Sequence, residues 1–329
     1  MTQPTDRRID KLVQLLVKNA TVVVPASKLA DEIKVPLHTV YYWVHKLREL
    51  GVDVRGIRGN GYQLRKLPDI LVPSLIYPQL GANQIGNKII HYFRTDSTNN
   101  VALSLILEGA SHGTVIVAEE QMAGRGRFDR TWYSEQTSGI YTSVILRPSL
   151  APAAAPILTL MAGLAVHHAV TEVTGLVADI RWPNDLMING KKVCGILTEM
   201  SAEADRIRGV VLGIGINVNH RQMPSELAVI GTSLRMEGGK DYSRAQLFLT
   251  LLKKLEHYYR MLMDGGNAAI TERWAMASSY AQAKRIHVTT RSGAFLATTV
   301  GLDPSGALCI RRDDGQEETL VAGDIVEAK

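Results

Sequence analysis

The most unusual segment of the sequence is rich in both glycine and arginine, a combination that can hold a phosphate group. Residues 124–132 read GRGRFDRTW, and the first seven of them include three arginines and two glycines. Glycine lets the backbone approach a ligand closely, and the planar guanidinium of arginine matches the oxygens of a phosphate. A solvated basic loop or a nucleic-acid contact would have the same composition, and the segment is neither a Walker A loop nor a Rossmann fingerprint.

Four further segments carry polar residues beside apolar stretches, and each alone has an ordinary structural explanation. The cluster at 96–100 (DSTNN) is typical of a helix cap, and 181–185 (RWPND) is typical of a turn. The lysines of 191–197 (KKVCGIL) stand at the mouth of an apolar strand, as they would in a surface hairpin. Glycines within a strand, as in 213–219 (GIGINVN), indicate either the close approach of a ligand or core packing.

In combination and order, these segments resemble the biotin–protein ligase family, in particular the bacterial members that also repress the biotin operon. The matching motifs are Gly124 to Arg127, Asp96 to Asn99, Trp182 to Asp185, Lys192 before a Gly-Ile-Leu strand, and Gly213 to Asn217. The resemblance covers almost the whole chain. It implies that biotin and ATP form biotinyl-5'-AMP, from which a lysine of the carrier subunit of acetyl-CoA carboxylase takes the biotin.

The resemblance also implies roles for individual residues. Catalysis falls to Lys192, Arg125 and Arg127, whose charges would offset the meeting of two anions. The biotin site would comprise Ser97, Thr98, Asn99, Gln121, Gly124, Arg125, Gly126, Arg127, Tyr141, Lys192, Gly213 and Gly215. The ATP site would comprise Arg127, Arg130, Trp132, Asn184, Lys192 and Asn217. Mg²⁺ would accompany ATP, and no resident metal site is expected. The arginine loop is expected to act as a lid that keeps water from the acyl-adenylate.

Two positions depart from the family pattern. Asp129 stands where the family usually has glycine, and Arg181 stands where lysine is common. Arg181 keeps the positive charge. Asp129 places a carboxylate inside a loop expected to close over biotin and a phosphate. We expect it to lower the flexibility or the affinity of the loop, although it removes no group that the chemistry needs.

The first fifth of the chain, residues 1–66, predicts a DNA-binding module. Apolar residues at helical spacing predict helices over 8–19, 27–33 and 37–50, and an Asn-Gly pair at 60–61 predicts a hairpin after them. This order is that of a winged helix-turn-helix. The module contains 12 Lys and Arg against 6 Asp and Glu, which favours a polyanionic partner. The residues placed for DNA are His38, Thr39, Tyr42, Lys46, Arg55 and Arg58.

The remaining chain predicts a linker and two further domains. Three spaced prolines indicate a linker over 67–82. Residues 83–281 mix predicted strands with helices, including 156–173 and 246–263, whereas 282–329 is a run of short strands typical of a small β-barrel. The fold class is therefore α+β and multidomain. By resemblance, the central mixed α/β domain is similar to class II synthetases and the last domain is SH3-like.

Composition and the implied partners complete the expectations. Hydrophobic residues make up 46% and charged residues 21% of the 329, as in a globular protein. We expect no apolar run long enough to span a membrane, and two distant cysteines fit a reducing cytoplasm. The resemblance implies operator DNA and a homodimer promoted by biotinyl-5'-AMP or DNA, with no membrane partner. The alternatives are a ligase whose winged helix no longer represses, a ligand sensor without catalysis, and a lipoate–protein ligase.

Overall fold

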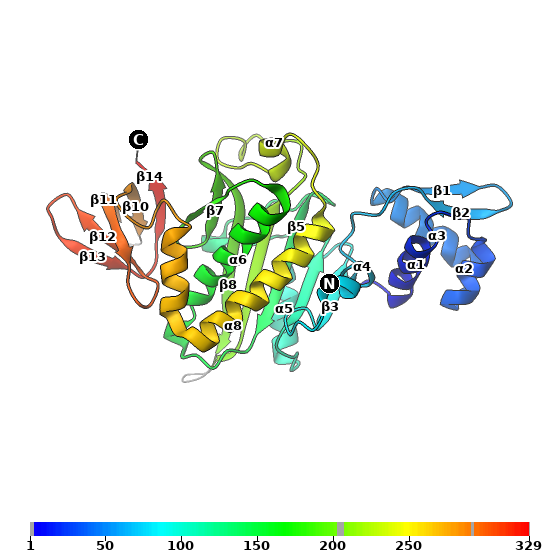
Figure 1. Cartoon of the computed structure of the whole chain (residues 1–329), viewed down its shortest axis with the longest axis horizontal. Helices are drawn as coiled ribbons and strands as arrows, with labels where there is room; N and C mark the ends of the chain where they lie inside the picture. The colour runs from blue at the N-terminus through cyan, green and yellow to red at the C-terminus, as the bar shows by residue number, and fades with distance from the viewer. Residues whose placement is uncertain (1–2, 203–206, 291–292, 329) are drawn as a thin grey trace.

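The computed structural model describes residues 3–202, 207–290 and 293–328, which form an elongated molecule with three parts in a row (Figure 1). A helical module with a hairpin lies at one end, a large α/β domain lies in the middle, and a small all-β domain lies at the other end. Their order along the chain is the order that the sequence predicts.

The N-terminal module has three helices and a two-stranded hairpin, as expected. Its elements are α1 (Arg7–Lys18), α2 (Ala26–Ile33), α3 (Leu37–Glu49), β1 (Val54–Ile57) and β2 (Gly61–Leu64). Apolar side chains at helical spacing, such as Leu12 on α1 and Val44 on α3, are fully buried in a core that belongs to this module. The periodicity that predicts the helices is therefore the periodicity of their packing.

The stretch predicted as a linker is packed, and it contains the helix α4 (Pro73–Leu80). Proline at the first position of a helix is favourable, because the missing N–H would have no partner there. Just before α4, Ile70 and Val72 pack into the N-terminal core, whereas Leu71 packs into the core of the central domain. Three consecutive residues are thus shared between the two parts.

A seven-stranded sheet forms the frame of the central domain. In spatial order its strands are β3 (Lys88–Tyr92), β4 (Thr114–Ala118), β5 (Gly139–Leu146), β9 (Ile207–Asn217), β8 (Lys191–Ala202), β7 (Asp185–Ile188) and β6 (Asp179–Arg181). β3 and β4 are parallel, and the other neighbours are antiparallel. Because Gly139 pairs with Asn217, the start of β5 lies beside the end of β9, the strand with the alternating glycines.

Helices cover both faces of this sheet (Figure 1). α6 (Ile157–Thr174) and α8 (Arg244–Met276) share the large apolar core on one face, whereas α5 (Thr98–Leu107) packs on the other. α8 extends beyond the predicted 246–263 at both ends and is interrupted at Gly266, where φ is +67°. Short α7 (Leu234–Gly238) and the 3₁₀ turns η1 (Arg127–Asp129) and η2 (Pro152–Ala154) lie between the longer elements.

One helical stretch contradicts the expectation that no apolar run is long enough to span a membrane. Pro152–Thr174 has 23 residues and, by length and composition alone, is apolar enough to cross a membrane. However, 67% of its most apolar window is buried inside the molecule, where α6 contacts α8 and the sheet. A helix that is apolar on all sides because it lies in a core has the same composition.

The C-terminal part is a five-stranded antiparallel sheet, the small β domain expected from the sequence. In spatial order its strands are β13 (Glu317–Leu320), β12 (Leu308–Arg312), β11 (Gly293–Leu302), β10 (Arg285–Thr290) and β14 (Asp324–Glu327). Its buried side chains, including Ile286 and Leu308, join the same apolar core as α6 and α8. Trp182 also donates from Nε1 to the carbonyl of Gly306 at 3.2 Å, which fastens this sheet beside the predicted site.

Candidate active site and nucleic-acid interface

A narrow slot lies between the N-terminus of α5 and the strands β5, β8 and β9. It encloses about 30 Å³, roughly the volume of one water molecule in the liquid. Its lining residues are Thr98, Asn99, Gln121, Trp132, Tyr141, Thr142, Gly195, Gly213, Ile214 and Gly215. Most of these residues come from the motifs that the sequence singles out, so segments far apart in the chain meet here as expected.

The indole of Trp132 forms one wall of the slot and lies against the glycines of β8 and β9. A Cβ atom at Gly215 would lie 2.4 Å from Nε1 of Trp132, and one at Gly195 would lie 2.8 Å from its ring. Glycine is therefore required at both strand positions while the ring is there. Nε1 is buried and has no hydrogen-bond partner among the described residues. The sequence assigns Trp132 to the nucleotide side, whereas the structure places it against the glycine strands.

The side chain of Gln121 is fixed at one end of the slot. Its Oε1 accepts from the backbone N–H of Thr98 at 2.8 Å and from the Thr98 hydroxyl at 3.1 Å, and its Nε2 donates to Ser134 Oγ at 2.9 Å. Gly124 allows this arrangement, because a Cβ atom there would lie 3.0 Å from Nε2 and 2.5 Å from the carbonyl of Trp132. An amide held at both ends is preoriented to read a polar ligand.

Asn99 belongs to a second polar group, on the α5 side. It accepts from Ser143 Oγ at 2.6 Å and donates to Glu199 Oε2 at 2.8 Å. The other oxygen of Glu199 accepts from Arg125 at 2.7 Å, and Arg125 also donates to Asn100 at 2.8 Å. The side chain of Arg125 therefore turns away from the slot, and only its backbone belongs to the loop that covers it.

Lys192 lies beside the slot within a group of three charges. Its Nζ is 2.5 Å from Asp185 Oδ1 and 5.4 Å from the centroid of the Trp132 ring. Asp185 Oδ2 accepts from Arg181 at 2.6 Å. Burial alone would raise the pKa of Asp185, but Lys192 and Arg181 hold it below its ordinary value. One carboxylate between two cations leaves a net positive charge beside the slot.

The other arginines of the loop contact the C-terminal domain. Arg127 lies 3.2 Å from Asp324 Oδ1 and donates to Asn184 Oδ1 at 3.1 Å. Arg130 lies 2.9 Å from the second oxygen of Asp324, with 70% of its side chain exposed. Three residues assigned to ATP, Arg127, Arg130 and Asn184, therefore lie near the carboxylate of Asp324. No sequence motif predicts this carboxylate.

The backbone of the loop explains why Asp129 is unusual. Phe128 and Asp129 both have positive φ angles, of 54° and 56°. This left-handed region suits glycine, and among other residues Asp and Asn adopt it most readily. Glycine at position 129 would therefore be the less strained choice, which agrees with the departure noted in the sequence.

The floor of the slot is closed by Tyr141 and His220. Tyr141 donates to the carbonyl of Glu135 at 2.8 Å, and its oxygen lies 3.2 Å from His220 Nε2. Burial raises the pKa of Tyr141 well above its ordinary value, and burial lowers the pKa of His220 to about 4. Both side chains are therefore neutral at pH 7. Ser233 donates to the carbonyl of His220, which joins this floor to the start of α7.

The structure brings most, but not all, of the predicted residues together. Thr98, Asn99, Gln121, Tyr141, Gly213 and Gly215 line the slot, and Lys192 and Gly124 flank it. Ser97 is buried at the cap of α5 and Gly126 lies in the loop, and neither lines the slot. Asn217 donates to the carbonyl of Thr232 at 3.0 Å and lies beyond Gly215 on β9. Among the described residues no group of three or more His, Cys, Asp or Glu could hold a metal ion.

Sequence reasoning missed several polar residues of the site. Glu199 and Asp324 come from other parts of the chain, and no local pattern marks either of them. Asp185 ends the motif from Trp182 to Asp185, so the sequence could have identified it as a site residue beside Lys192. His220 lies three residues after the end of the glycine strand β9. This proximity in sequence is the only signal that it contacts Tyr141 of the slot.

The N-terminal module presents the residues assigned to DNA on its surface. His38, Tyr42, Lys46, Arg55 and Arg58 are exposed, and Thr39 is half-buried. Tyr41, which the sequence reasoning did not select, is also 48% exposed. Glu49 pairs with Lys46 at 3.1 Å and with His45 at 3.2 Å. On the exposed face of α3, Glu49 therefore offsets the charge of Lys46 beside two exposed tyrosines, and further exposed cations lie on the wing.

Comparisons with known families match the three parts of the chain in order. Residues 8–63 match the HTH domain, residues 92–217 match the Biotin/lipoate A/B protein ligase family, and residues 284–326 match the biotin protein ligase C-terminal domain. These regions agree with the module, the central domain and the small β domain described above.

Individual relatives give the same result over longer stretches. The chain is 37% identical to the bifunctional ligase/repressor BirA of Bacillus subtilis over 308 residues, which are 92% of this chain and 94% of the relative. It is 32% identical to the biotin–[acetyl-CoA-carboxylase] ligase of Paracoccus denitrificans, over 68% of this chain and 94% of the relative. Its structure is similar to that of the biotin protein ligase of Aquifex aeolicus in complex with biotin and ATP. That match has a TM-score of 0.64 and 28% identity, and covers 74% of this chain and 99% of the other.

Proposed function

The chain belongs to the family of bifunctional biotin ligases and repressors, and we propose that it uses the slot and the cations beside it to activate biotin with ATP and attach it to a carrier protein. The acceptor is a lysine of the carrier subunit of acetyl-CoA carboxylase. The observation that carries the proposal is the slot itself, which preoriented Gln121 lines and beside which Lys192 lies, with its Nζ 5.4 Å from the centroid of the Trp132 ring.

In the first step an oxygen of the biotin carboxylate forms a bond to the α-phosphorus of ATP. The bond from that phosphorus to the bridging oxygen breaks, and pyrophosphate leaves. Two anions must meet, so a fixed cation lowers the barrier. Lys192 suits this role, because Asp185 is shared with Arg181 and the three side chains keep a net positive charge.

In the second step the neutral amine of the carrier lysine attacks the carbonyl carbon of biotinyl-5'-AMP. AMP leaves with the bonding electron pair, and the amine gives up a proton. The mixed anhydride is prone to hydrolysis, so the site must exclude water. The loop 124–130 can provide the lid, because its arginines could leave the half-exposed Asp324 for phosphate oxygens.

The polar ring of biotin would be read by Thr98 and Gln121 at the slot, with Ser97 behind them. A slot of about 30 Å³ cannot hold biotin, so the indole of Trp132 must first leave it. The glycines of β8 and β9 would then face the ligand. Displaced from the slot, Trp132 would lie on the nucleotide side together with Asn184 and Asn217, as the family pattern implies.

Mg²⁺ would enter with ATP, held mainly by phosphate oxygens, as is usual for this ion. The carboxylates described beside the slot, Asp185, Glu199 and Asp324, are already paired with cations. They offer no ready protein cage, so we propose no resident metal.

We further propose that residues 1–66 bind operator DNA and that residues 83–281 and 282–329 form the ligase. Residues 67–82 link the DNA-binding module to the ligase. α3 would enter the major groove, with His38, Thr39 and Tyr42 at base edges. Lys46, Arg55 and Arg58 would contact phosphates, which position the module without reading sequence. A homodimer promoted by biotinyl-5'-AMP would place two modules on a palindromic site.

The test is to incubate the protein with ATP, Mg²⁺, biotin and a biotin carrier domain, and to weigh the carrier by mass spectrometry. We expect one biotinyl group to be added, and none when lipoate replaces biotin. Transfer of lipoate alone would support the lipoate ligase instead.

A band shift on DNA upstream of the biotin genes, with and without biotin and ATP, tests repression separately. Absent or ligand-independent binding would leave a ligase without that function.

A further inference from the structure

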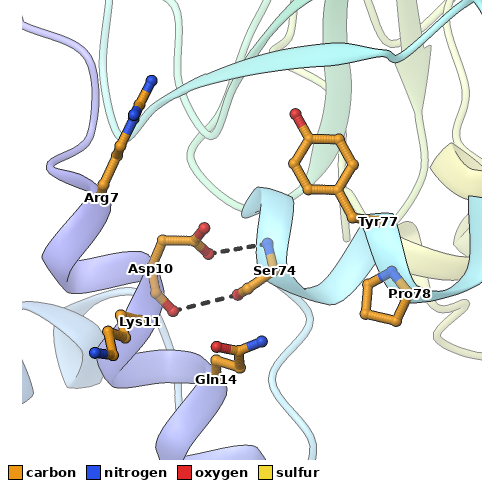
Figure 2. A pocket seen from close by; sticks show the side chains of 7 residues that line it. All are labelled: Arg7, Asp10, Lys11, Gln14, Ser74, Tyr77 and Pro78. Atoms are coloured by element: carbon orange, nitrogen blue, oxygen red, sulfur yellow. Dashed lines mark hydrogen bonds between the residues drawn. The ribbon is translucent and has the colours of Figure 1, made fainter. Parts of the chain in front are cut away.

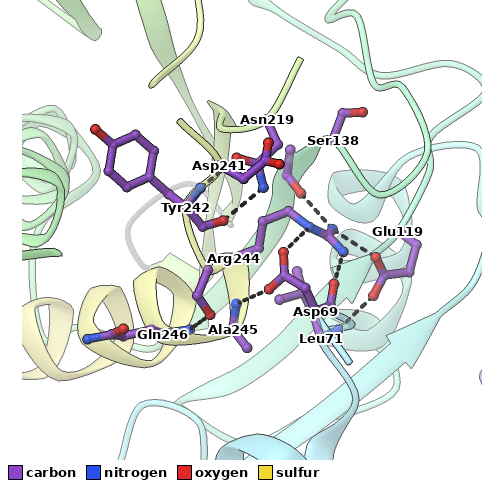
Figure 3. Close-up of polar contacts among 12 residues, drawn as sticks. Asp69, Leu71, Glu119, Ser138, Asn219, Asp241, Tyr242, Arg244, Ala245 and Gln246 are labelled. Atoms are coloured by element: carbon purple, nitrogen blue, oxygen red, sulfur yellow. Dashed lines mark hydrogen bonds and ion pairs between the residues drawn. The ribbon is translucent and has the colours of Figure 1, made fainter. Parts of the chain in front are cut away.

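The segment between the winged helix and the central domain is held by a buried charge cluster beside the slot. Its centre is Arg244, the first residue of α8, which is fully buried. Arg244 donates to Glu119 Oε2 at 2.8 Å and to the carbonyl of Gly139 at 3.1 Å, and it also binds both the carboxylate and the carbonyl of Asp69 (Figure 3). Asp69 belongs to the segment that leads from the winged helix.

Glu119 extends the cluster to the linking segment and, through His91 of β3, to the N-terminal end of the chain. Its Oε1 accepts from the backbone N–H of Leu71 at 2.7 Å and lies 3.1 Å from His91 Nε2. His91 in turn contacts Thr5, whose hydroxyl lies 2.8 Å from Nδ1 and whose N–H donates to the carbonyl of His91 at 2.7 Å. Burial alone would raise the pKa of Glu119, but Arg244 and His91 lower it to about 2, so its charge persists at any physiological pH.

A second contact fastens the following helix to both neighbours (Figure 2). Ser74 of α4 donates from its backbone N–H to Asp10 Oδ1 at 3.0 Å and from its hydroxyl to the carbonyl of Asp10 at 3.2 Å. Tyr77, one turn later on α4, accepts from the backbone N–H of Ile89 at the start of β3 at 2.7 Å. The winged helix is therefore docked on the central domain by polar contacts as well as by the shared apolar residues 70–72.

The same cluster is continuous with the walls of the slot. Gly139 lies two residues before Tyr141 on β5. Glu119 follows β4 and lies two residues before Gln121. Tyr141 and Gln121 both line the slot. A ligand that contacts Gln121 and Tyr141 would hold these chain segments in place. The acceptors of Arg244 and of Leu71 would then be held in place as well.

We propose that Asp69, Arg244 and Glu119 are positioning residues that couple the filling of the slot to the docking of the DNA-binding module. The inference rests on the proposed function, since it concerns the same slot and the same DNA. A ligand can shift docking only by binding the docked state better, and the coupling is reciprocal between the two sites. The docked segment 69–72 is the element whose equilibrium both sites bias.

The first arm of the test measures amide hydrogen exchange of residues 69–72 without DNA, before and after adding biotin, ATP and Mg²⁺. In the wild type we expect the ligand to slow exchange at Leu71. In Asp69→Asn we expect exchange about tenfold faster, because a charged hydrogen-bond partner holds this segment, and no further slowing by ligand. Arg244→Met should give the same result. Asp69→Asn provides the test even if burial makes Arg244→Met fold poorly.

The control is Arg147→Met, which removes a guanidinium at the opposite end of β5. Arg147 donates to the carbonyls of Ala110, Ile106 and Arg208, none of which belongs to the linking segment. A merely structural role for Arg244 predicts faster exchange in its variant, but the same slowing by ligand at Leu71 as in the wild type and in Arg147→Met. The proposal predicts that only the Arg244 and Asp69 variants lose the ligand effect at Leu71, while Asp69→Asn keeps wild-type kcat/KM for biotin.

The second arm measures DNA affinity with and without biotin and ATP. We expect Asp69→Asn to reduce the gain in affinity on adding ligand by about fivefold or more, the lower end of usual coupling between sites. A ligand effect at Leu71 that is equal in wild type and both variants would overturn the proposal. If the wild type binds no DNA, the repressor function fails, and the exchange arm still decides whether slot and segment are coupled.

Discussion

Two clusters of arginine and carboxylate join the central domain to its neighbours, and they differ in exposure. Towards the C-terminal domain, Arg127 and Arg130 share Asp324, whose side chain is 28% exposed, and the side chains of Arg127 and Arg130 are 22% and 70% exposed. Towards the winged helix, Arg244 binds Glu119 and Asp69, and the side chains of Arg244 and Glu119 are completely buried. Charged pairs in water exchange partners at little cost, whereas buried pairs are costly to break.

This difference matches the roles that we assign to the two junctions. The loop arginines must be able to leave Asp324 when phosphates arrive, so a weak and accessible ion pair is suitable there. The Arg244 cluster must hold the linking segment firmly, so that only a ligand favouring the docked state shifts it further. Similar side chains thus serve as a readily replaced contact at one junction and a firmly held one at the other.

The largest expected effect separates the two clusters by stability. Arg244→Met should lower the free energy of unfolding by about 3–5 kcal/mol, because it leaves two carboxylates without their cation. Arg130→Met should lower it by less than about 1 kcal/mol. Urea unfolding followed by circular dichroism measures both. Equal losses would show that burial does not distinguish the clusters.

A second prediction concerns acid. His220 has an ordinary pKa of 6.5, which burial lowers to about 4, so the unfolded chain binds a proton first and stability falls as pH falls from 6.5 towards 4. Glu119 stays ionised down to about 2, against an ordinary 4.5, so its contribution is present above pH 4.5 and is lost towards pH 2. Each loss is on the order of 3 kcal/mol, at about 1.4 kcal/mol per pKa unit.

The variant His220→Gln separates these two acid phases. It should reduce the fall in unfolding free energy between pH 6.5 and 4 and leave the fall below 4.5, while His112 and His167, whose pKa values burial also lowers, still contribute to the upper phase. Denaturant midpoints at a series of pH values measure both phases. A wild-type fall that persists in full in His220→Gln would assign the upper phase to other groups.

A smaller effect is expected at the exposed cluster. Asp324→Asn should speed hydrogen exchange in residues 124–130 about fivefold, since surface ion pairs contribute up to about 1 kcal/mol. Biotin with ATP should slow exchange in the same residues in both proteins, because the ligand replaces Asp324 as the partner. Exchange in this loop that is slow without ligand and unaffected by the variant would contradict its role as a lid.

The smallest effect is expected at the unusual residue of the loop. Asp129→Gly relieves a positive φ of 56° and should change the free energy of unfolding by no more than about 1 kcal/mol, because glycine also gains freedom in the unfolded chain. A thermal melt measures this. A loss above that size would mean that the Asp129 carboxylate makes a stabilising contact.

The sequence predicts the elements well where a periodic pattern is also the pattern of burial. The three helices of the winged module and the strand that alternates glycine and isoleucine from Gly213 are examples. It predicts poorly where residues distant in the chain decide the outcome. The stretch 67–82 has the prolines of a linker, yet residues 70–72 are buried because two cores meet there.

The same distinction applies to the site. Lys192 and Gln121 lie within recognisable motifs and can be selected from the sequence. Glu199, Asp324 and Arg244 act through contacts across the fold, and the residues around them carry no signal of their own. The position of Trp132 in the slot depends on space left by Gly195 and Gly215, which only the paired strands show.

The measurement that tests the central claim most directly is biotin-dependent exchange of labelled pyrophosphate into ATP, which reports adenylate formation alone. We expect exchange in the wild type and in Lys191→Ala, whose lysine donates to the carbonyl of Ala228. In Lys192→Ala we expect a loss of about 100-fold or more, the usual effect of removing a charge-stabilising group. Exchange at the wild-type rate in a folded Lys192→Ala, or exchange that does not require biotin, would contradict the account.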